Sequence, residues 1–241
     1  MDEMTMVDFS KEMDKGTPVI LPIGCLEGHG PHMPLGTDNF QPEFVAQEVA
    51  KRMDCIIAPP IRYGNATVTR HLPGSLCLSV GLVQQLVTEI LEELVRNRAS
   101  RIMVLSGHAG SSHMSALKEA ARDVLQEHPE VVLYVLSDWD IVYNEFMEMV
   151  PDGDGHGGCI ETARVMAIRP DLVSEKRPSS FAIDYPEYRV FTDYSDIFTK
   201  GFRGDPSSAN MEIGKEMNQK VIDRIVEILT NTNNINMRGG E

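Results

Sequence analysis

Cysteine is scarce in this chain of 241 residues, and the four cysteines lie far apart, with no C-x-x-C pair. Their spacing argues against a zinc knuckle and a disulfide framework, so we expect reduced thiols. Basic residues are also too few to balance the acidic ones: 22 lysines and arginines against 36 aspartates and glutamates give a net charge of −14. A chain of this charge repels phosphate groups, and we expect neither nucleic acid nor a membrane surface as a partner.

Long apolar runs are absent as well, and no segment is apolar over the length of a membrane-spanning helix. The first residues, MDEMTMVDFSKEMDKG, lack the basic and apolar regions of a secretory signal. We therefore expect a soluble, cytoplasmic protein. The length and the hydrophobic content of 42% suffice for one large core, which predicts a single domain over residues 1–241 with a fraying tail over 231–241.

Short apolar runs alternate with amphipathic segments along the chain. The segment from Ser79 is the clearest helix, because its apolar residues repeat at helical spacing and its glutamates stay off that stripe. Asp38 or Asn39, and later Ser111 or Ser112, are predicted to cap helices. The predicted strands cover residues 17–23, 55–58, 101–106 and 131–137, and the predicted helices begin near residues 38, 79, 111, 158 and 211.

This alternation predicts an α/β fold with a mostly parallel central sheet and helices on both faces. Ligands of such sheets bind beyond the carboxyl ends of the strands. Three polar clusters directly follow predicted strands, namely residues 27–38, His108 and residues 138–161. We expect these clusters to meet at one edge of the sheet, and we expect residues 170–210 to be the least regular part of the chain.

The densest cluster lies in VILPIGCLEGHGPHMPLGTD, residues 19–38, where Glu27, His29 and Asp38 share a loop stiffened by glycine and proline. Glu27 and His29 are two residues apart, so an extended backbone directs both side chains to one face. His108 in SGHAGSS adds an imidazole from another strand end. Mixed imidazole and carboxylate ligands suit zinc, manganese or iron(II), and a site with open positions would activate water.

Each residue alone also has a simpler interpretation. Asp38 by itself is more typical of a helix cap than of a metal ligand, and His32 could support a ligand or serve packing. Isolated histidines such as His71 and His113 are usually solvated or hydrogen bonded. Taken together, however, the acids and histidines at the strand ends would be buried charge without a partner, which favours a metal site.

Beyond these patterns, the sequence resembles the creatininase family, also called creatinine amidohydrolase-like proteins. The resemblance is carried by LPIGCLEGHGPHMPLGTD, HLPGS at residues 71–75, SGHAGSS at 106–112, SDWD at 137–140, HGGCIETA from residue 156 and GDPSSAN near the C-terminus. These motifs follow the family's order and span nearly the whole chain.

The resemblance implies a creatininase-like fold, a centre of two divalent metal ions (Zn, Mn or Fe(II)) and hydrolysis of a carbon–nitrogen bond. It also implies a homo-oligomer, for which a hexamer is one candidate. Matched by motif, Glu27 and His108 would hold one metal and His29 the other, with Asp38 as the bridge.

Two further residues match the family in HGGCIETA. His156 corresponds to a histidine that acts near the substrate in proton transfer, and Glu161 would complete the second metal's shell or orient its water. Glu161 also lies at a predicted helix start, where a carboxylate could merely be a partner of the helix dipole.

The sequence also departs from creatininase itself. A tyrosine and a ligating glutamate follow the motif histidine there, whereas Ala109 and Gly110 stand here, so one ligand of the second metal is missing. Asp152 replaces a tryptophan of the creatinine pocket, while Trp139 matches a lid tryptophan. Cys25 stands where relatives often have serine, and with no evident base nearby we expect a packed residue rather than a nucleophile.

From these features we expect a metal-dependent amidohydrolase that uses activated water to break a non-peptide amide, cyclic amide or formyl amide bond in a small molecule. The departures argue against creatinine as that molecule. A peptide-processing amidohydrolase of cofactor maturation is one alternative. A non-catalytic protein, in which the metal braces an oligomer or a binding module, is the other.

Overall fold

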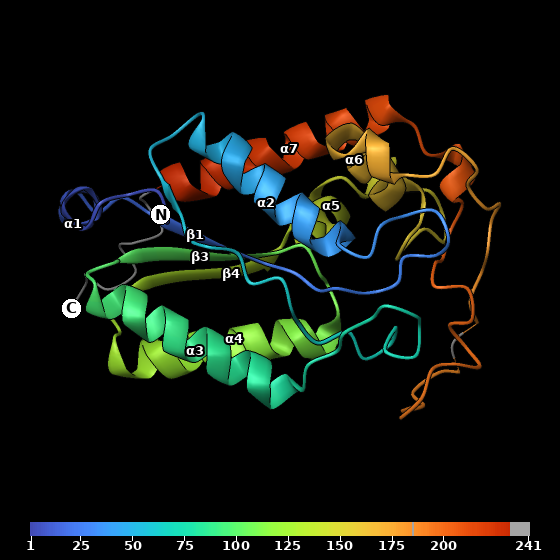
Figure 1. Ribbon diagram of the computed structural model, residues 1–241, viewed down its shortest axis with the longest axis horizontal. Helices are drawn as coiled ribbons and strands as arrows, with labels where there is room; N and C mark the ends of the chain where they lie inside the picture. The colour runs from blue at the N-terminus through green and yellow to red at the C-terminus, as the bar shows by residue number, and fades with distance from the viewer. Residues whose placement is uncertain (185, 232–241) are drawn as a thin grey trace.

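A computed structural model describes residues 1–184 and 186–231, and a four-stranded parallel sheet forms its centre (Figure 1). The strands are β1 (Val19–Ile23), β2 (Ile56–Ile57), β3 (Arg101–Ser106) and β4 (Val132–Ser137), in the order β2-β1-β3-β4. Ile23 pairs with Ser106 and Ser106 with Ser137, so three strands end at the same level. The predicted α/β class is confirmed, and the loops after these strands emerge at one edge.

Helices connect and flank the strands. Within the described residues they are α1 (Met6–Asp14), α2 (Thr37–Ala50), α3 (Val80–Arg96), α4 (Ser111–Glu127), α5 (Asp138–Glu145), α6 (Cys159–Ile168) and α7 (Met211–Thr230), with short 3-10 turns η1 (Met147–Met149), η2 (Pro170–Leu172) and η3 (Pro206–Ser208). In this part of the chain, no helix combines the length and the apolar character needed to cross a membrane.

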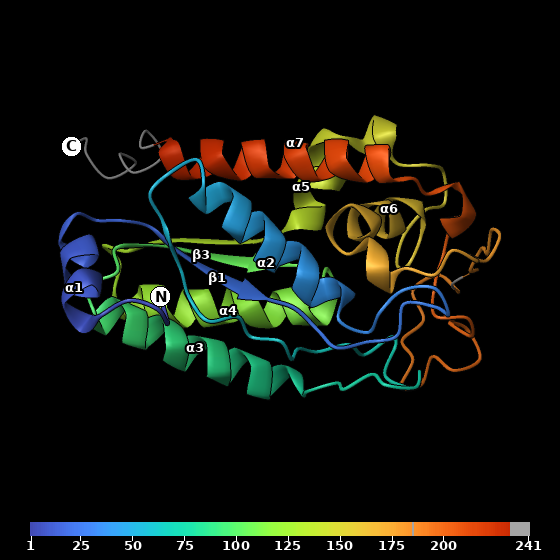
Figure 2. The ribbon, with the colours of Figure 1, turned by 45° about the horizontal axis from the view of Figure 1, so that its top comes forward.

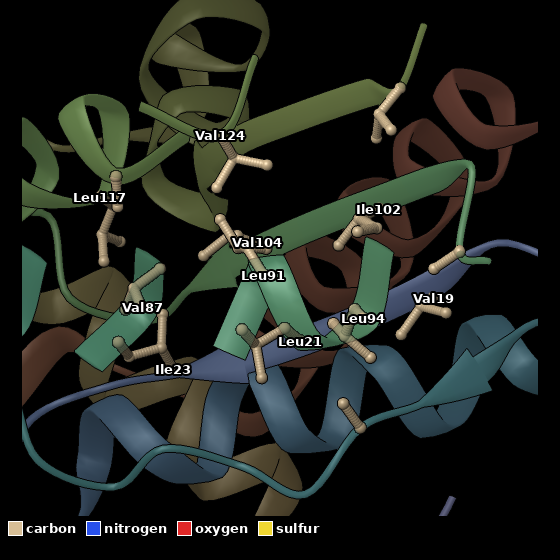
Figure 3. Close-up of a cluster of buried hydrophobic side chains, with 14 of the residues drawn as sticks. Val19, Leu21, Ile23, Val87, Leu91, Leu94, Ile102, Val104, Leu117 and Val124 are labelled. Carbon is tan, nitrogen blue, oxygen red and sulfur yellow. The ribbon is translucent and has the colours of Figure 1, made fainter. Parts of the chain in front are cut away.

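The helices cover both faces of the sheet, as Figure 2 shows with α7 and α2 on one side and α3 and α4 on the other. Along β1, Leu21 and Ile23 pack with α3 and α4, whereas Ile20 packs with α2 and α7 on the opposite face. Because side chains alternate across a strand and both faces are covered, every residue of β1 is buried. Figure 3 shows the cluster on the first face, where Val87 and Leu91 of α3 lie against the strands.

Helix α2 begins differently from the prediction. Its first residue is Thr37, Gly36 precedes it, and no side chain caps it, so the prediction that Asp38 or Asn39 is the cap is wrong. Both residues lie inside the first turn. The Asn39 amide instead donates to the carbonyl oxygen of Cys25 at 2.9 Å, and the Asp38 carboxylate points to the histidines described below.

Two other predicted boundaries are also wrong. The strand expected over residues 55–58 shrinks to the two residues of β2. The Ala58 amide still donates to the carbonyl oxygen of Ile20 at 2.8 Å, and Pro59 and Pro60, which have no amide hydrogen, then interrupt the ladder. Helix α4 follows Gly110 without a side-chain cap, so neither Ser111 nor Ser112 has the predicted role.

Helices α1 and α5 are not among the helices predicted from the sequence. A capping box starts α5: Ser137 Oγ accepts from the Trp139 amide at 3.2 Å, and the Asp140 carboxylate accepts from the Ser137 amide at 2.9 Å. The sequence SDWD carries this signal, but the helix spans only 8 residues, too few for helical periodicity to stand out.

Helix α7 packs against α6 at close range. A Cβ added at Gly214 of α7 would lie 1.8 Å from the carbonyl oxygen of Ala163 in α6, so only glycine permits this approach. The contact fixes the position of α6. Helix α7 ends at Thr230, and apart from Asn231 the tail predicted over 231–241 lies outside the described residues.

Between η2 and η3, the described residues hold no helix or strand apart from one isolated bridge between Phe181 and Gly204. This part matches the predicted irregular region. It lies at the end of the molecule where the strand loops emerge (Figure 1). There the amide of Arg203 donates to the carbonyl oxygen of His156 at 2.8 Å, which ties the irregular segment to the start of α6.

Candidate metal centre

Five side chains meet at the carboxyl edge of the sheet. Glu27 and His29 come from the loop after β1, Asp38 from the first turn of α2, His108 from the loop after β3, and Glu161 from the first turn of α6. All are at most 3% exposed except His108, whose side chain is 11% exposed. The structure thus brings together every residue that the sequence proposes as a metal ligand.

Asp38 stands between the two histidines. Its Oδ1 lies 3.0 Å from His29 Nε2, and its Oδ2 lies 2.9 Å from His108 Nδ1. One carboxylate therefore faces two imidazoles through different oxygen atoms. This is the arrangement expected of a ligand shared by two adjacent ions.

Asp38 is itself held by backbone contacts from two strand ends. A Cβ added at Gly24, directly after β1, would lie 2.3 Å from the Asp38 carbonyl oxygen, and one at Gly107, directly after β3, would lie 2.1 Å from the same atom. Only glycine lets these loops approach the first turn of α2 so closely. The position of Asp38 relative to the sheet is therefore fixed.

Backbone carbonyls orient both imidazole rings. His29 Nδ1 lies 3.1 Å from the carbonyl oxygen of Glu27, and His108 Nε2 lies 3.1 Å from that of Asn65. A carbonyl oxygen only accepts, so these nitrogens carry the hydrogen in the neutral rings. The opposite nitrogens then present bare lone pairs to the carboxylates, as metal-binding histidines do.

The two glutamates flank this core. Glu27 Oε1 lies 2.7 Å from His108 Nδ1, and its other oxygen accepts from the Thr69 hydroxyl. Glu161 Oε2 lies 3.6 Å from His29 Nε2 and accepts from the Gly157 amide at 2.6 Å. Glu27 thus belongs with His108, and Glu161 with His29.

The centre concentrates negative charge. The carboxylates of Glu27, Asp38 and Glu161 share it, and no described lysine or arginine forms an ion pair with them. Burial alone would lower the pKa of His29, but the Asp38 and Glu161 carboxylates outweigh it and hold that pKa well above its usual range. The pKa of His108 is also held well above its usual range, because the Glu27 carboxylate, more than any other group, outweighs the effect of burial. The site therefore requires positive charge, as protons or as metal ions.

The residues present fit a metal centre. Glu27 Oε1, His29 Nε2 and Asp38 Oδ2 are buried without a hydrogen-bond partner, which is costly unless an ion or water fills the space between them. Three overlapping groups have ligand spacing, with ligand atoms within 4.8 Å of one another: His29, Asp38 and Glu161; Glu27, His29 and His156; and Cys25, Asp38 and His108. Oxygen and nitrogen donors of this kind suit zinc, manganese or iron(II).

His156 lies beside the centre rather than within it. Its ring stacks on His29, with 4.0 Å between the centroids, and its Nε2 lies 2.8 Å from the carbonyl oxygen of Gly28. Nε2 is therefore the donor, which leaves Nδ1 free at 3.8 Å from Glu27 Oε1. The side chain of His156 is 23% exposed, more than any of the five side chains of the centre.

Gly110 stands where creatininase has a ligating glutamate, and no other residue of this loop takes the place of that glutamate. A Cβ there would lie 2.4 Å from His108 Nε2, so this backbone leaves no room for a side chain. Besides Asp38, the carboxylate near His29 is that of Glu161 on α6.

Several supporting residues have roles that the sequence does not indicate. Gln41 donates to Glu161 Oε1 at 3.3 Å, and the amide of Asn65 donates to His113 Nδ1 at 3.3 Å. His113 packs edge-on against His108 with 5.2 Å between centroids, and burial lowers the pKa of His113 to about 3, which keeps it neutral. Their positions show no periodicity or motif that could have identified them.

The other histidines are not ligands in this arrangement. His32 Nε2 lies 3.0 Å from the Thr162 hydroxyl on α6, and burial lowers the pKa of His32 to about 4. His71 Nε2 donates to the carbonyl oxygen of Phe198 at 3.1 Å. Both histidines link loops of the site to neighbouring segments.

Cys25 should not react as a nucleophile. It is fully buried, and burial raises the pKa of its thiol to about 11, so the thiol stays protonated at neutral pH. We expect iodoacetamide at pH 8 to leave Cys25 unlabelled in the folded protein and to modify the half-buried Cys77 first, as peptide mapping would show. Rapid labelling of Cys25, or loss of turnover in Cys25→Ala with metal content retained, would contradict this expectation.

A cavity of about 280 Å³ opens onto the centre. Glu27, Asp38, His108, His156 and Glu161 form part of its wall. Trp139, Tyr143 and Phe198 line it as aromatic residues, and no lysine or arginine is among the described residues around it. Its size is at the small end of ligand pockets, and its wall suits an uncharged, partly apolar group.

The parallel sheet and the buried cluster at its carboxyl edge define an α/β protein with a candidate two-metal centre. The chain belongs to the creatininase family, whose model, described as creatinine amidohydrolase, matches residues 2–229.

Individual relatives agree with this assignment. The chain is 29% identical to a creatinine amidohydrolase of Pseudomonas putida over 245 residues, covering 94% of this chain and 91% of the relative. It is 27% identical to a mycofactocin precursor peptide peptidase of Mycobacterium ulcerans over 222 residues, covering 86% and 82%. A crystal structure of creatininase superposes with a TM-score of 0.87 at 26% identity over 95% of each chain. Other solved creatininase structures are described as a Zn-Zn type and as Mn.

Proposed function

We propose that this protein is a metal-dependent amidohydrolase that uses water to break a carbon–nitrogen bond in a small amide, cyclic amide or formyl amide. The observation that carries the proposal is the buried Asp38 carboxylate, which faces His29 and His108 at the wall of the cavity. Membership of the creatininase family supports it, as do the amide-cleaving relatives.

The geometry suggests how the ligands divide between two ions. Glu27 and His108 would hold one ion, His29 and Glu161 the other, and Asp38 would contact both. Divalent metals at such sites lower the pKa of bound water and polarise the carbonyl of a substrate. Because the ligands are buried and oriented by hydrogen bonds, little reorganisation is needed when the ions bind.

His156 is suited to the proton transfer that amide cleavage requires. Water adds its oxygen to the carbonyl carbon, the carbon–nitrogen bond breaks, and the departing nitrogen must gain a proton. His156 lines the cavity and its Nε2 is held by Gly28, so Nδ1 is the atom that can pass this proton on. The stacking on His29 keeps the ring next to the reacting group.

Creatinine itself is a poor candidate for the substrate. Asp152, which takes the place of a pocket tryptophan in the resemblance, is exposed and does not line the cavity. A peptide is the second candidate, because several relatives are described as mycofactocin precursor peptide peptidases and because a second cavity adjoins the first.

A substrate screen tests the proposal. Protein loaded with zinc, manganese or iron(II) is incubated with cyclic amides, N-formyl amines and short peptides, and release of ammonia, formate or amine is measured. We expect turnover of at least one class, loss of turnover on chelation, and recovery when metal is restored. Undiminished turnover in metal-free protein would refute metal dependence. One fully coordinated metal per chain without turnover would favour the non-catalytic alternative.

A further inference from the structure

A second cavity adjoins the metal cavity and shares part of its wall. Tyr143, Gly155, His156 and Phe198 line both. His156 therefore stands at the boundary between the two spaces. A substrate whose scissile nitrogen lies at His156 can place its acyl part against the metal centre and extend its amine part into the second cavity.

Arg203 is the only lysine or arginine among the described residues that line either cavity. Its Nε donates to the carbonyl oxygen of Gly153 at 3.0 Å, and its backbone amide is fixed to His156. The first contact orients the guanidinium, and the second holds the backbone that carries it. No described carboxylate forms an ion pair with the guanidinium, although acids outnumber basic residues 36 to 22 in the chain. An oriented guanidinium without an acidic partner suits recognition of a planar anion.

The surrounding groups select a carboxylate over a phosphate. Asp154 also lines the second cavity, but its carboxylate is committed to the start of α6, where it accepts from the amides of Cys159 at 2.6 Å and Ile160 at 3.0 Å. These amides are thus closed to an anionic ligand. The charge of Asp154 remains nearby and would repel a doubly charged phosphate more strongly than a singly charged carboxylate.

We propose that Arg203 forms a second subsite, reached past His156, which binds a carboxylate on the amine part of the substrate. This inference rests on the proposed hydrolysis and narrows the substrate to an N-acylated amino acid or a peptide-like acid. The reaction is then R–CO–NH–R′–COO⁻ + H₂O → R–COO⁻ + ⁺H₃N–R′–COO⁻. The nitrogen gains its proton at His156, and the amino acid product stays in the second cavity until release.

Matched compounds test the subsite. N-acetyl and N-formyl derivatives of glycine, β-alanine and γ-aminobutyrate are compared with the corresponding N-acyl amino alcohols, which replace the carboxylate with a neutral group. Amine release gives kcat and KM. Quenching of Trp139, the single tryptophan of the chain and part of the first cavity, gives the dissociation constants separately from turnover.

We expect the wild-type protein to prefer at least one acid over its alcohol by about 10- to 100-fold, the value of a charge-assisted hydrogen bond. In Arg203→Gln, which can still donate to Gly153 but has no charge, this preference should vanish, mainly through a higher KM. Arg203→Lys should restore part of it. Arg122→Gln, on the exposed surface of α4 and away from both cavities, should leave the preference intact.

Different failures point to different errors. If the acids bind in an Arg203-dependent way but are not cleaved, the proposed hydrolysis is wrong and the subsite stands. Cleavage or binding without a preference for the acids would overturn the subsite and leave the hydrolase intact. A preference that persists in Arg203→Gln would place the carboxylate at the metal centre and would also overturn it.

Discussion

Replacing Asp38 with asparagine is expected to remove most of the bound metal and to lower kcat at least about a thousandfold, because metal ions supply several kcal/mol of transition-state stabilisation. Asparagine keeps the size of the side chain but not the charge that lies between His29 and His108. Metal content by elemental analysis and turnover of the best amide substrate measure the two effects.

The fold should survive this substitution. Burial raises the pKa of Asp38, and the nearby Glu27 carboxylate adds to this shift, which outweighs the opposite effect of His29 and His108, so the charge is costly when no metal is bound. Metal-free Asp38→Asn should therefore unfold no earlier than the metal-free wild type. Asp171→Asn, which alters an exposed ion pair with Arg169, is the matched control and should keep metal and activity. Full activity with normal metal content in Asp38→Asn would disprove the assignment of the centre.

Replacing Arg164 with methionine is expected to destabilise the protein by about 3–5 kcal/mol, since it leaves a buried charge unpaired. Arg164 is fully buried on α6, where its Nη2 donates to Asp138 Oδ2 at 2.6 Å and its Nε donates to Asn218 Oδ1 at 2.8 Å. Its guanidinium carbon lies 5.3 Å from the centre of the Trp139 ring. Urea unfolding followed by circular dichroism measures the loss independently of changes in tryptophan emission.

The stability lost in Arg164→Met should depend on pH. Burial raises the pKa of Asp138 even in the wild type, and Arg164 opposes that shift, so removal of Arg164 raises the pKa further. A carboxyl with a raised pKa in the folded state favours folding when protonated. The deficit of Arg164→Met relative to the wild type should therefore be smallest near the ordinary carboxyl pKa of about 4 and grow toward neutral pH.

A double variant separates the unpaired charge from lost packing. Asp138→Asn combined with Arg164→Met removes both charges and should recover most of the stability, with little dependence on pH. If the double variant is as unstable as the single one at neutral pH, packing of the arginine stem and not the ion pair accounts for the effect.

The sequence was sufficient to predict the sheet and the edge at which the candidate ligands meet, for physical reasons. Buried parallel strands are continuous apolar runs, such as residues 102–105, and ligands gather where such strands end. Because Glu27 and His29 are two residues apart, the sequence already indicated that their side chains point to the same face. For Asp38 the sequence left two roles open, helix cap or ligand, and the structure decides against the cap because Gly36 precedes the helix.

Other parts of the site depend on contacts that no local pattern reveals. Asn65 acts through its backbone groups, which face His108 and His113, so its identity gives no signal. The ion pair of Arg164 and Asp138 joins residues 26 positions apart. The motif HGGCIETA marks Glu161 as a candidate ligand, but the distance of Glu161 from His29 depends on how α6 rests against α7.

The close contacts of Gly24 and Gly107 with the Asp38 carbonyl have a consequence for how this sequence can vary. Neither glycine offers a functional group, yet any side chain at either position would displace the turn that presents Asp38. Random mutagenesis with selection for activity should therefore reject changes at positions 24 and 107 about as strictly as changes of the ligands. Chemical function thus restricts sequence divergence at two positions that take no part in the chemistry.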